Sequence, residues 1–258
     1  MNTSFAVAPD GTQIAYDCCG TGPAIILLHG GGGRRQEWQE AGYVGRLQDD
    51  FTVITPDLRG HGESSLPTDP ADYTIDKMIQ DILAVADACG TEHFALCGMS
   101  HGGKTGRYLA VHSERVDKFV LISAPLGPGA SHQLRQEIAD FTAHWDPLLQ
   151  AQRDGSLDFA ALSRDDQAFL QNFKVAPMLG WGPAMIEWYP VVPADFRCPV
   201  LWIIGSEDRQ GMESLRELEP VLEGSPVQVH IVPGLDHGQV FDEIDMVFPV
   251  IQAFMREK

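Results

Sequence analysis

Short apolar runs, separated by segments of helical periodicity, constrain the fold of this chain more than any other feature. Apolar residues are continuous or nearly so at positions 24–28, 51–55, 94–97, 119–122, 200–204 and 227–232. Such runs are typical of strands buried on both faces. Apolar residues recur at helical spacing from Ile75 to Ala86, after Gly103, and from Val240 to Phe254. We therefore predict an α/β fold with a mostly parallel sheet and helices on both faces.

The two ends of this alternating pattern differ from its middle. Near the start, Phe5–Val7 and Thr12–Tyr16 flank a turn-forming segment, Pro9-Asp10-Gly11-Thr12, which predicts a hairpin. From about Pro125 to Asp195 no strand is evident and aromatic residues are frequent. We predict a core of residues 1–124 and 196–258, with a mainly helical cap, residues 125–195, inserted over the carboxyl edge of the sheet. Open α/β sheets bind their ligands at that edge.

The charge balance limits the classes of partner. The chain has 18 Lys and Arg against 36 Asp and Glu, a net charge of −18. Nucleic acids and anionic membranes both require a basic face, so we expect neither as a partner. The N-terminus has no basic segment followed by an apolar one, and the longest aliphatic run is too short to span a bilayer. The five cysteines form no C-x-x-C motif. We expect a cytoplasmic protein with reduced thiols and a small-molecule substrate.

A G-x-S-x-G motif supplies the candidate nucleophile. Residues 97–103, Cys-Gly-Met-Ser-His-Gly-Gly, follow a predicted strand and begin a predicted helix. In that context the serine sits on a sharp turn that exposes its hydroxyl, and the flanking glycines let the backbone make the turn. The start of the following helix favours developing negative charge. Ser100 is therefore the predicted nucleophile.

Residues 98–105 also fit a phosphate-loop pattern, G-x-x-x-x-G-K-[ST], again between a strand and a helix. Two observations disfavour this alternative. The run at 119–122 ends in Ser123-Ala124, without the aspartate that would hold magnesium. A phosphate loop also explains none of the motifs that follow. The chain has no H-E-x-x-H motif and no Cys/His cluster with zinc spacing, so we expect no metal and no cofactor. Lys104 is expected on the helix surface.

A glycine run follows the first long strand, in His29-Gly30-Gly31-Gly32-Gly33. Its backbone N–H groups are not covered by side chains. Such groups can hold the oxyanion of an acyl-transfer intermediate together with the N–H that follows the nucleophile. We predict Gly31 and His101 as the two oxyanion donors, and His29, Gly30 and Gly32 as part of the substrate pocket.

A serine nucleophile needs a base and a group that orients the base. Of the nine histidines, His237 is best placed, because it follows the last strand at a loop-to-helix junction. The acid should follow an earlier strand, and the segment Gly205-Ser206-Glu207-Asp208 does so. Asp208 is the predicted acid and Glu207 is the alternative. The chain order Ser100, Asp208, His237 is that of α/β-hydrolases.

Together with residues 57–64, Asp-Leu-Arg-Gly-His-Gly-Glu-Ser, these motifs resemble the α/β-hydrolase superfamily over nearly the whole chain. The resemblance implies a core of about eight strands with a cap over the site. It also implies several chemistries. Epoxide hydrolases and haloalkane dehalogenases use an aspartate nucleophile, and Ser100 argues against both. Serine members include carboxylesterases, lactonases, cofactor-free perhydrolases and carbon–carbon bond hydrolases, and some members are hormone receptors that keep the triad.

These observations predict a serine hydrolase that cleaves a carboxylic ester or lactone through an acyl-enzyme on Ser100. A carbon–carbon bond hydrolase or perhydrolase with the same triad, and a non-catalytic receptor for a small ligand, remain as alternatives. Aromatic and sulfur side chains of the cap, Trp181, Met185 and Trp188, are expected to line the substrate pocket. Arg34 and Arg35 are expected to be solvated at the start of a helix.

Overall fold

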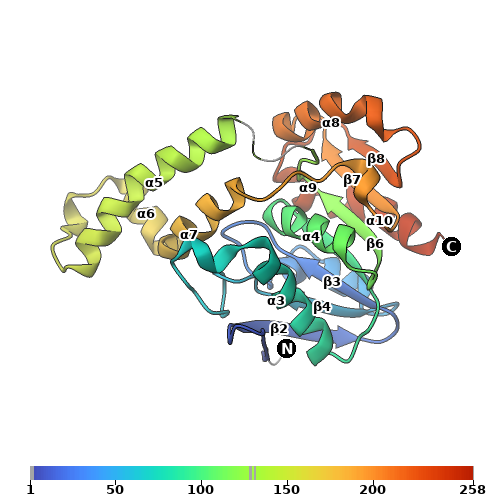
Figure 1. Cartoon of the computed structure of the whole chain (residues 1–258), viewed down its shortest axis with the longest axis horizontal. Coiled ribbons are helices and arrows are strands. Elements are labelled where there is room, and N and C mark those ends of the chain that lie inside the picture. Colours follow the sequence, from blue (N-terminus) through green and yellow to red (C-terminus); the bar gives the residue numbers. More distant parts are fainter. Residues whose placement is uncertain (1–2, 128–129, 131, 258) are drawn as a thin grey trace.

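The computed structural model describes residues 3–127, 130 and 132–257 (Figure 1). Within this part of the chain, eight strands form one sheet in the order β1-β2-β4-β3-β5-β6-β7-β8. The strands are β1 (Ser4–Val7), β2 (Gln13–Gly20), β3 (Ala24–Leu28), β4 (Thr52–Pro56), β5 (Phe94–Met99), β6 (Val116–Ile122), β7 (Val200–Gly205) and β8 (Val227–Val232). β2 pairs antiparallel with both β1 and β4, and the remaining pairs are parallel. The predicted fold class is confirmed, and so is the N-terminal hairpin.

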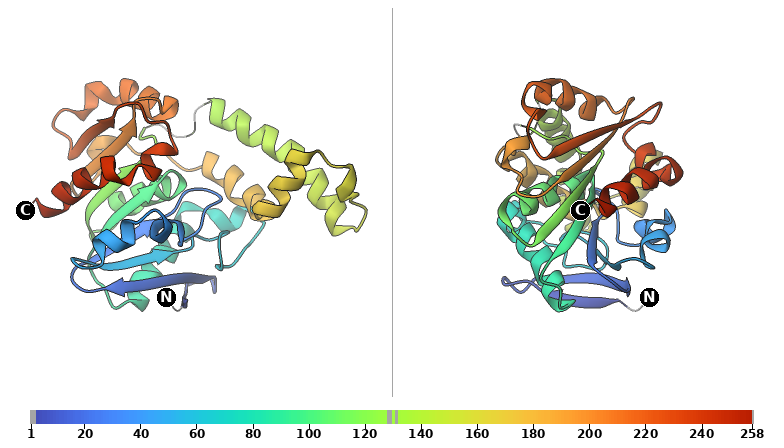
Figure 2. Two further views of the ribbon diagram at one scale, coloured as in Figure 1. Left: turned by 180° about the vertical axis from the view of Figure 1, so that it is seen from behind. Right: turned by 90° about the vertical axis from the view of Figure 1, so that its right-hand side faces the viewer.

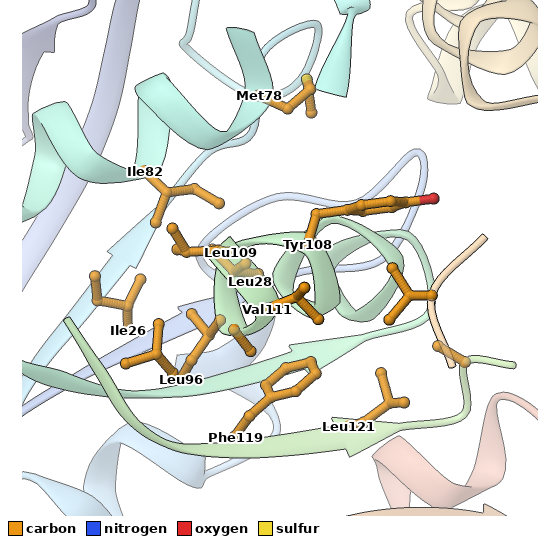
Figure 3. Close-up of a cluster of buried hydrophobic side chains, with 14 of the residues drawn as sticks. Ile26, Leu28, Met78, Ile82, Leu96, Tyr108, Leu109, Val111, Phe119 and Leu121 are labelled. Carbon is orange, nitrogen blue, oxygen red and sulfur yellow. The ribbon is translucent and has the colours of Figure 1, made fainter. Parts of the chain in front are cut away.

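Helices cover both faces of this sheet. One face packs against α3 (Ile75–Ala88), α4 (His101–His112) and α8 (Arg209–Leu222). The other packs against α1 (Glu37–Glu40), α2 (Tyr43–Leu47), α9 (Gln239–Asp242) and α10 (Ile244–Arg256). Successive residues of a strand point to opposite faces, so β3 contributes Ile26 and Leu28 to the first core and Ile25 and Leu27 to the second. Figure 3 shows the first core beneath α3 and α4. Burial on both sides explains why these strands are apolar throughout.

The sequence predicts one continuous helix at the C-terminus, and this prediction is wrong. The structure has two helices there, α9 and α10, separated at Glu243, whose backbone leaves the helical region with φ −83° and ψ 59°. Val240 and Val247, on either side of the break, both belong to the second core. The apolar spacing therefore continues across the break, because both helices pack on the same face of the sheet.

The segment between β6 and β7 is helical. It contains α5 (His132–Arg153), α6 (Arg164–Asn172), α7 (Val175–Ile186) and two short 3₁₀ helices, Phe159–Ala161 and Pro193–Asp195. α5 and α6 extend away from the sheet (Figures 1 and 2), and α5, α6 and α7 share a small core around Trp145 and Leu149. α7 contacts the 3₁₀ helix Pro70–Tyr73 of the main body. The arrangement supports, as a proposal, the division into a core and an inserted cap over residues 125–195.

Two further features concern the apolar character of the helices and the state of the cysteines. Among the described helices, none has both the length and the apolar character needed to cross a bilayer. α5, with 22 residues, carries charged residues along its length. All five cysteines are free thiols.

Candidate active site

Ser100 lies at a sharp turn between a strand and a helix. β5 ends at Met99 and α4 begins at His101, so Ser100 alone connects them, with φ 49° and ψ −110°. A positive φ is unfavourable for a residue with a Cβ, and such strain persists only where surrounding contacts impose it. Here the Ser100 N–H donates to the Ile122 carbonyl at 2.9 Å, and the Ser100 carbonyl accepts from the Lys104 N–H at 2.8 Å. The phosphate-loop alternative is wrong, because a single residue leaves no loop that could wrap a phosphate.

The two glycines of the motif allow backbones to touch directly. A Cβ on Gly102 would lie 2.3 Å from the Leu28 carbonyl oxygen, and one on Gly98 would lie 2.7 Å from the Gly102 carbonyl oxygen. Both distances are well inside van der Waals contact. The start of α4 therefore packs against the ends of β3 and β5 with no room for a side chain, and this close approach fixes the direction of Ser100.

We expect Gly102→Ala to destabilise the fold by about 1–3 kcal/mol or more, because overpacking against backbone has no side chain to relieve it. Gly45→Ala is the matched control. Gly45 is also helical, and a Cβ there meets nothing within 4 Å, so its higher helix propensity should stabilise by up to about 1 kcal/mol. Urea denaturation of both variants measures the contrast. Equal stability changes in the two variants would contradict the packing argument.

His237 connects Ser100 to Asp208 by two hydrogen-bond distances. Its Nε2 lies 3.0 Å from Ser100 Oγ, and its Nδ1 lies 3.1 Å from Asp208 Oδ2. The Asp208 side chain is only 3% exposed, whereas that of His237 is 42% exposed. Glu207 is exposed, so the structure places Asp208, and not Glu207, against the imidazole. The arrangement has the geometry of a nucleophile, a base and a group that orients the base.

The loops that carry Asp208 and His237 are joined to each other. The Gly234 N–H donates to Ser206 Oγ at 2.8 Å, and the Glu207 N–H donates to the Leu235 carbonyl at 2.9 Å. Asp208 is also the N-cap of α8, where its Oδ1 accepts from the Gly211 N–H at 3.0 Å. These bonds fix the separation of the two side chains before any substrate arrives.

Hydrogen bonding keeps Asp208 ionised. Burial alone would raise the pKa of this carboxyl. The hydrogen bonds from His237 and from the backbone N–H groups of Gly211 and Gln210 outweigh burial, so the pKa of Asp208 lies below its usual value. A charged carboxylate at this position favours an imidazole that carries its proton on Nδ1, which leaves Nε2 free to accept a proton from Ser100.

The predicted oxyanion donors lie side by side. A Cβ built on Gly31 would be 3.5 Å from the Cβ of His101, and one on Gly30 would be 3.8 Å from the Cβ of Ser100. The structure gives the backbone N–H groups of Gly31 and His101 no partner within the described residues. Two unpaired donors beside a nucleophile can hold an oxyanion.

Neutral histidines support the glycine loop from behind. The Gly32 N–H donates to His61 Nε2 at 3.1 Å, and the Leu58 N–H donates to His29 Nε2 at 3.0 Å. Each ring therefore carries its proton on Nδ1, which donates to the Arg59 carbonyl in His61 and to the Gly30 carbonyl in His29. Burial, with a smaller effect of the neighbouring His29, lowers the pKa of His61 to about 3, and burial also lowers the pKa of His29. Sequence reasoning missed His61 as a support of this loop.

These rings make the fold sensitive to acid. Burial lowers the pKa of His29, His61 and His101, so each takes up a proton on unfolding once the pH falls below the value of a free histidine, ~6.5. The free energy of unfolding should then fall by about 1.4 kcal/mol per pH unit for each of them. His61→Gln removes one such proton. Urea denaturation from neutral to acid pH should give a shallower slope for this variant, and an unchanged slope would contradict the role of burial.

The residues predicted to line a substrate pocket divide into two groups. Gly30 and Gly32 line a cavity of about 230 Å³ beside the glycine loop, and Met185 lines a separate cavity of about 340 Å³. Trp181 covers Gly31, with a ring carbon 3.1 Å from where a Cβ would be, and its ring centre lies 4.7 Å from that of His101.

The other two predicted pocket residues are placed differently. His29, 1% exposed, supports the glycine loop. Trp188, 5% exposed, packs in the core and donates from Nε1 to the Tyr73 carbonyl at 3.2 Å. Sequence spacing alone could not separate these two residues from pocket residues, because helix packing decides which way a ring points.

Arg35 corrects a further prediction. Arg34 is exposed as expected, but Arg35 is 2% exposed and forms ion pairs with Asp57 and Asp17. Asp57 Oδ1 also accepts from the Arg35 N–H at 2.7 Å. This buried pair joins the end of the glycine loop to the segment after β4. Asp17 within β2 and Asp57 directly after β4 were the sequence signal that Arg35 has acidic partners.

Comparisons with known proteins give consistent results. A family model described as the alpha/beta hydrolase fold matches residues 23–173. A 3-oxoadipate enol-lactonase from Acinetobacter baylyi is 34% identical over 119 residues, which is 45% of this chain and 43% of that protein. The match thus spans less than half of that relative's length. No group of three or more His, Cys, Asp and Glu side chains in the described chain is placed to hold a metal ion.

Two solved structures match over nearly full length at low identity. An epoxide hydrolase from metagenomes of hot environments has a TM-score of 0.77 at 23% identity, covering 100% of this chain and 99% of that one. An enol-lactonase from Burkholderia xenovorans has a TM-score of 0.72 at 22% identity, covering 98% of this chain and 100% of that one. At these identities the likeness concerns the fold alone.

Proposed function

Because the chain belongs to the alpha/beta hydrolase fold family, we propose that it is a serine hydrolase that cleaves a carboxylic ester or lactone. The observation that carries the proposal is the continuous contact from Ser100 Oγ through His237 to Asp208, at 3.0 and 3.1 Å. This is the arrangement that acyl transfer requires, since a hydroxyl becomes a strong nucleophile only when a base removes its proton.

Each residue then has one role. Ser100 Oγ attacks the carbonyl carbon while His237 Nε2 takes the hydroxyl proton, and Asp208 stabilises the imidazolium that forms. The N–H groups of Gly31 and His101 hold the oxyanion, assisted by the N-terminus of α4. The tetrahedral intermediate collapses when His237 gives its proton to the leaving alkoxide oxygen. Water, deprotonated by the same imidazole, attacks the acyl-enzyme and releases the acid.

The nucleophile distinguishes this chemistry from that of the family members that open epoxides or remove halogens. Their reaction, as the family resemblance implies, uses an aspartate as the nucleophile at the turn between strand and helix, and this chain has Ser100 at that position. A serine gives an acyl-enzyme with an ester or lactone. We therefore place this chain with the serine esterases and lactonases as a proposal.

The experiment is a substrate panel assayed with the wild-type protein and Ser100→Ala. The panel contains 4-nitrophenyl esters of increasing chain length, several lactones and a vinylogous diketone. We expect turnover of an ester or a lactone that disappears in Ser100→Ala. Cleavage of the diketone alone would move the chain to the carbon–carbon bond hydrolases. Tight binding with no turnover of any substrate would move it to the receptors.

A further inference from the structure

A second concave site lies next to the nucleophile. A cavity of about 340 Å³ is lined by residues of α4, α5, α7 and α8 and of the segment after β6, among them Lys104, Arg107, Met185 and Gln210. Lys104 follows Ser100 by one helical turn, a rise of about 6 Å. Gln210 lies two residues after Asp208. The cavity is within the size range of small-molecule sites, about 300–1,000 Å³. Its lining includes residues that follow Ser100 and Asp208 closely in the chain, but not the catalytic residues themselves.

Arg107 is a buried cation without an acidic partner. The residue is 5% exposed. Its Nη1 donates to the Pro125 carbonyl at 3.0 Å, and its Nη2 donates to the Tyr108 hydroxyl at 3.1 Å. Nε has no hydrogen-bond partner, and within the described chain no carboxylate lies at ion-pair distance from the guanidinium. Burying a charge without a counter-ion is costly, and native proteins normally avoid it.

Lys104 adds a second cation to the same cavity. No hydrogen bond or ion pair involves its ammonium group among the residues that the structure describes. Burial, followed by repulsion from Arg107, lowers the pKa of Lys104 to about 8, so it is still mostly charged at neutral pH. Lys104 is half-buried and lines this cavity, so the expectation of a residue on the helix surface holds only in part. The charged and titratable groups that face Lys104 are Arg107 on α4, His132 and Glu137 on α5, and Asp208, Glu213 and Glu217 at or on α8.

We propose that this cavity binds a carboxylate of the substrate through Lys104 and Arg107. The substrate is then an ester or lactone that carries a carboxylate a few carbons from the bond that is cleaved. The inference rests on the proposed function, whose nucleophile lies one helical turn away. An arginine fork and a lysine ammonium are the side chains that bind carboxylates most strongly. Met185 offers an apolar contact for the methylene groups between the carboxylate and the reacting carbonyl.

A carboxylate fits better than a phosphate because of the acidic residues nearby. Glu213 and Glu217 also line the cavity, and both are exposed on α8. They repel a doubly charged phosphate more strongly than a singly charged carboxylate. The competing explanation is that one of these glutamates rotates inward and pairs with Lys104, so that the cavity binds no anion.

The main experiment compares substrates that differ by one charge. Mono-4-nitrophenyl esters of glutarate, adipate and pimelate are paired with the corresponding half-amides, in which an amide replaces the free carboxylate. We expect kcat/KM for the preferred half-ester to exceed that of its half-amide by about tenfold or more, equivalent to about 1.4 kcal/mol. Lys104→Met should remove this preference by raising KM for the half-ester, and it should leave the half-amide nearly unchanged. Arg197→Met, at an exposed position, is the charge-matched control and should keep the preference.

The outcomes separate this inference from the proposed function. If the wild-type protein hydrolyses half-amides and half-esters equally, the carboxylate subsite is wrong and the esterase proposal stands. If Lys104→Met slows both substrates equally, Lys104 is structural and the subsite is again wrong. If neither substrate is hydrolysed, the esterase proposal fails, and the subsite is judged by calorimetric titration of Ser100→Ala with glutarate. Binding that Lys104→Met abolishes supports the subsite, and no binding overturns it. Phosphate, titrated in parallel, should bind more weakly than glutarate.

Stability and pH give independent readouts. Burial disfavours the charged form of Lys104, so removing this half-buried charge should raise Tm in Lys104→Met, whereas a lysine already paired with Glu137, Glu213 or Glu217 predicts a lower Tm and overturns the inference. The preference for half-esters should decline as the pH rises through about 8, where Lys104 loses its charge. The half-amide serves as the reference, because the protonation of His237 affects both substrates alike. A preference that is constant from pH 7 to pH 10 would contradict the role of Lys104.

Discussion

Ser100→Ala is expected to lower kcat on the preferred ester by ~10⁶-fold, and His237→Ala by a similar factor, as in a serine protease in which the two groups act as a unit. The physical reason is that the hydroxyl is a weak nucleophile without the base, and the base has nothing to activate without the hydroxyl. Because Ser100 Oγ and His237 Nε2 are in contact at 3.0 Å, these two residues act together in the proton transfer. The double variant should therefore be no slower than either single variant.

Covalent labelling tests the same assignment without a known substrate. An organophosphonate or sulfonyl fluoride probe should add one label to the wild-type protein, and intact-mass spectrometry should find none on Ser100→Ala. Circular dichroism and Tm of each variant show whether the fold is retained. Labelling that survives in Ser100→Ala, or rate losses that multiply in the double variant, would place the nucleophile elsewhere.

Asp208→Asn is expected to lower kcat by ~10⁴-fold, the loss seen for the corresponding change in a serine protease. The amide keeps the size of the side chain but can donate to Nδ1, which favours the imidazole with its proton on Nε2, the wrong atom for a base. Asp208 is 3% exposed and contacts Nδ1 at 3.1 Å, so water cannot substitute for it.

Glu207→Gln is the matched control for this prediction. Glu207 precedes Asp208 and is exposed, so its rate should stay within about tenfold of wild type, or about 1.4 kcal/mol of barrier. Because Asp208 also caps α8, thermal denaturation must accompany the kinetics. A rate ranking in the opposite order, with Glu207→Gln inactive, would assign the acid to Glu207.

The residues at the catalytic contact could be predicted from sequence because each lies within five residues of the end of a strand. Ser100 comes immediately after β5, Asp208 three residues after β7, and His237 five residues after β8. The ends of neighbouring parallel strands meet at one edge of the sheet, so chain order and strand position were enough to bring them together. The glycine motifs were equally informative, because only glycine permits backbones to approach as closely as at Gly102 and Leu28.

What escaped prediction depends on contacts that sequence spacing does not encode. Arg35 is buried because Asp57 and Asp17 converge on it from two strands. Lys104 faces a cavity because residues of the later helices α5, α7 and α8 complete its lining. The inward orientation of Trp188 follows from a hydrogen bond to Tyr73. In each case a side chain's role was set by a partner far away in the chain, and no local pattern identified that partner.

The small separate core of α5, α6 and α7 has a consequence for how such proteins diverge. Trp145 and Leu149 pack among residues of the same insert, and their cluster is distinct from both cores of the sheet. Leu134 and Ile138, near the start of α5, pack against the first core instead. Changes in the rest of α5 and in α6 can therefore accumulate with little effect on the strand ends that hold Ser100, Asp208 and His237. Insertions and substitutions are tolerated best where few contacts cross to the rest of the fold, so this outer part of the chain can change in sequence while the catalytic contact stays the same.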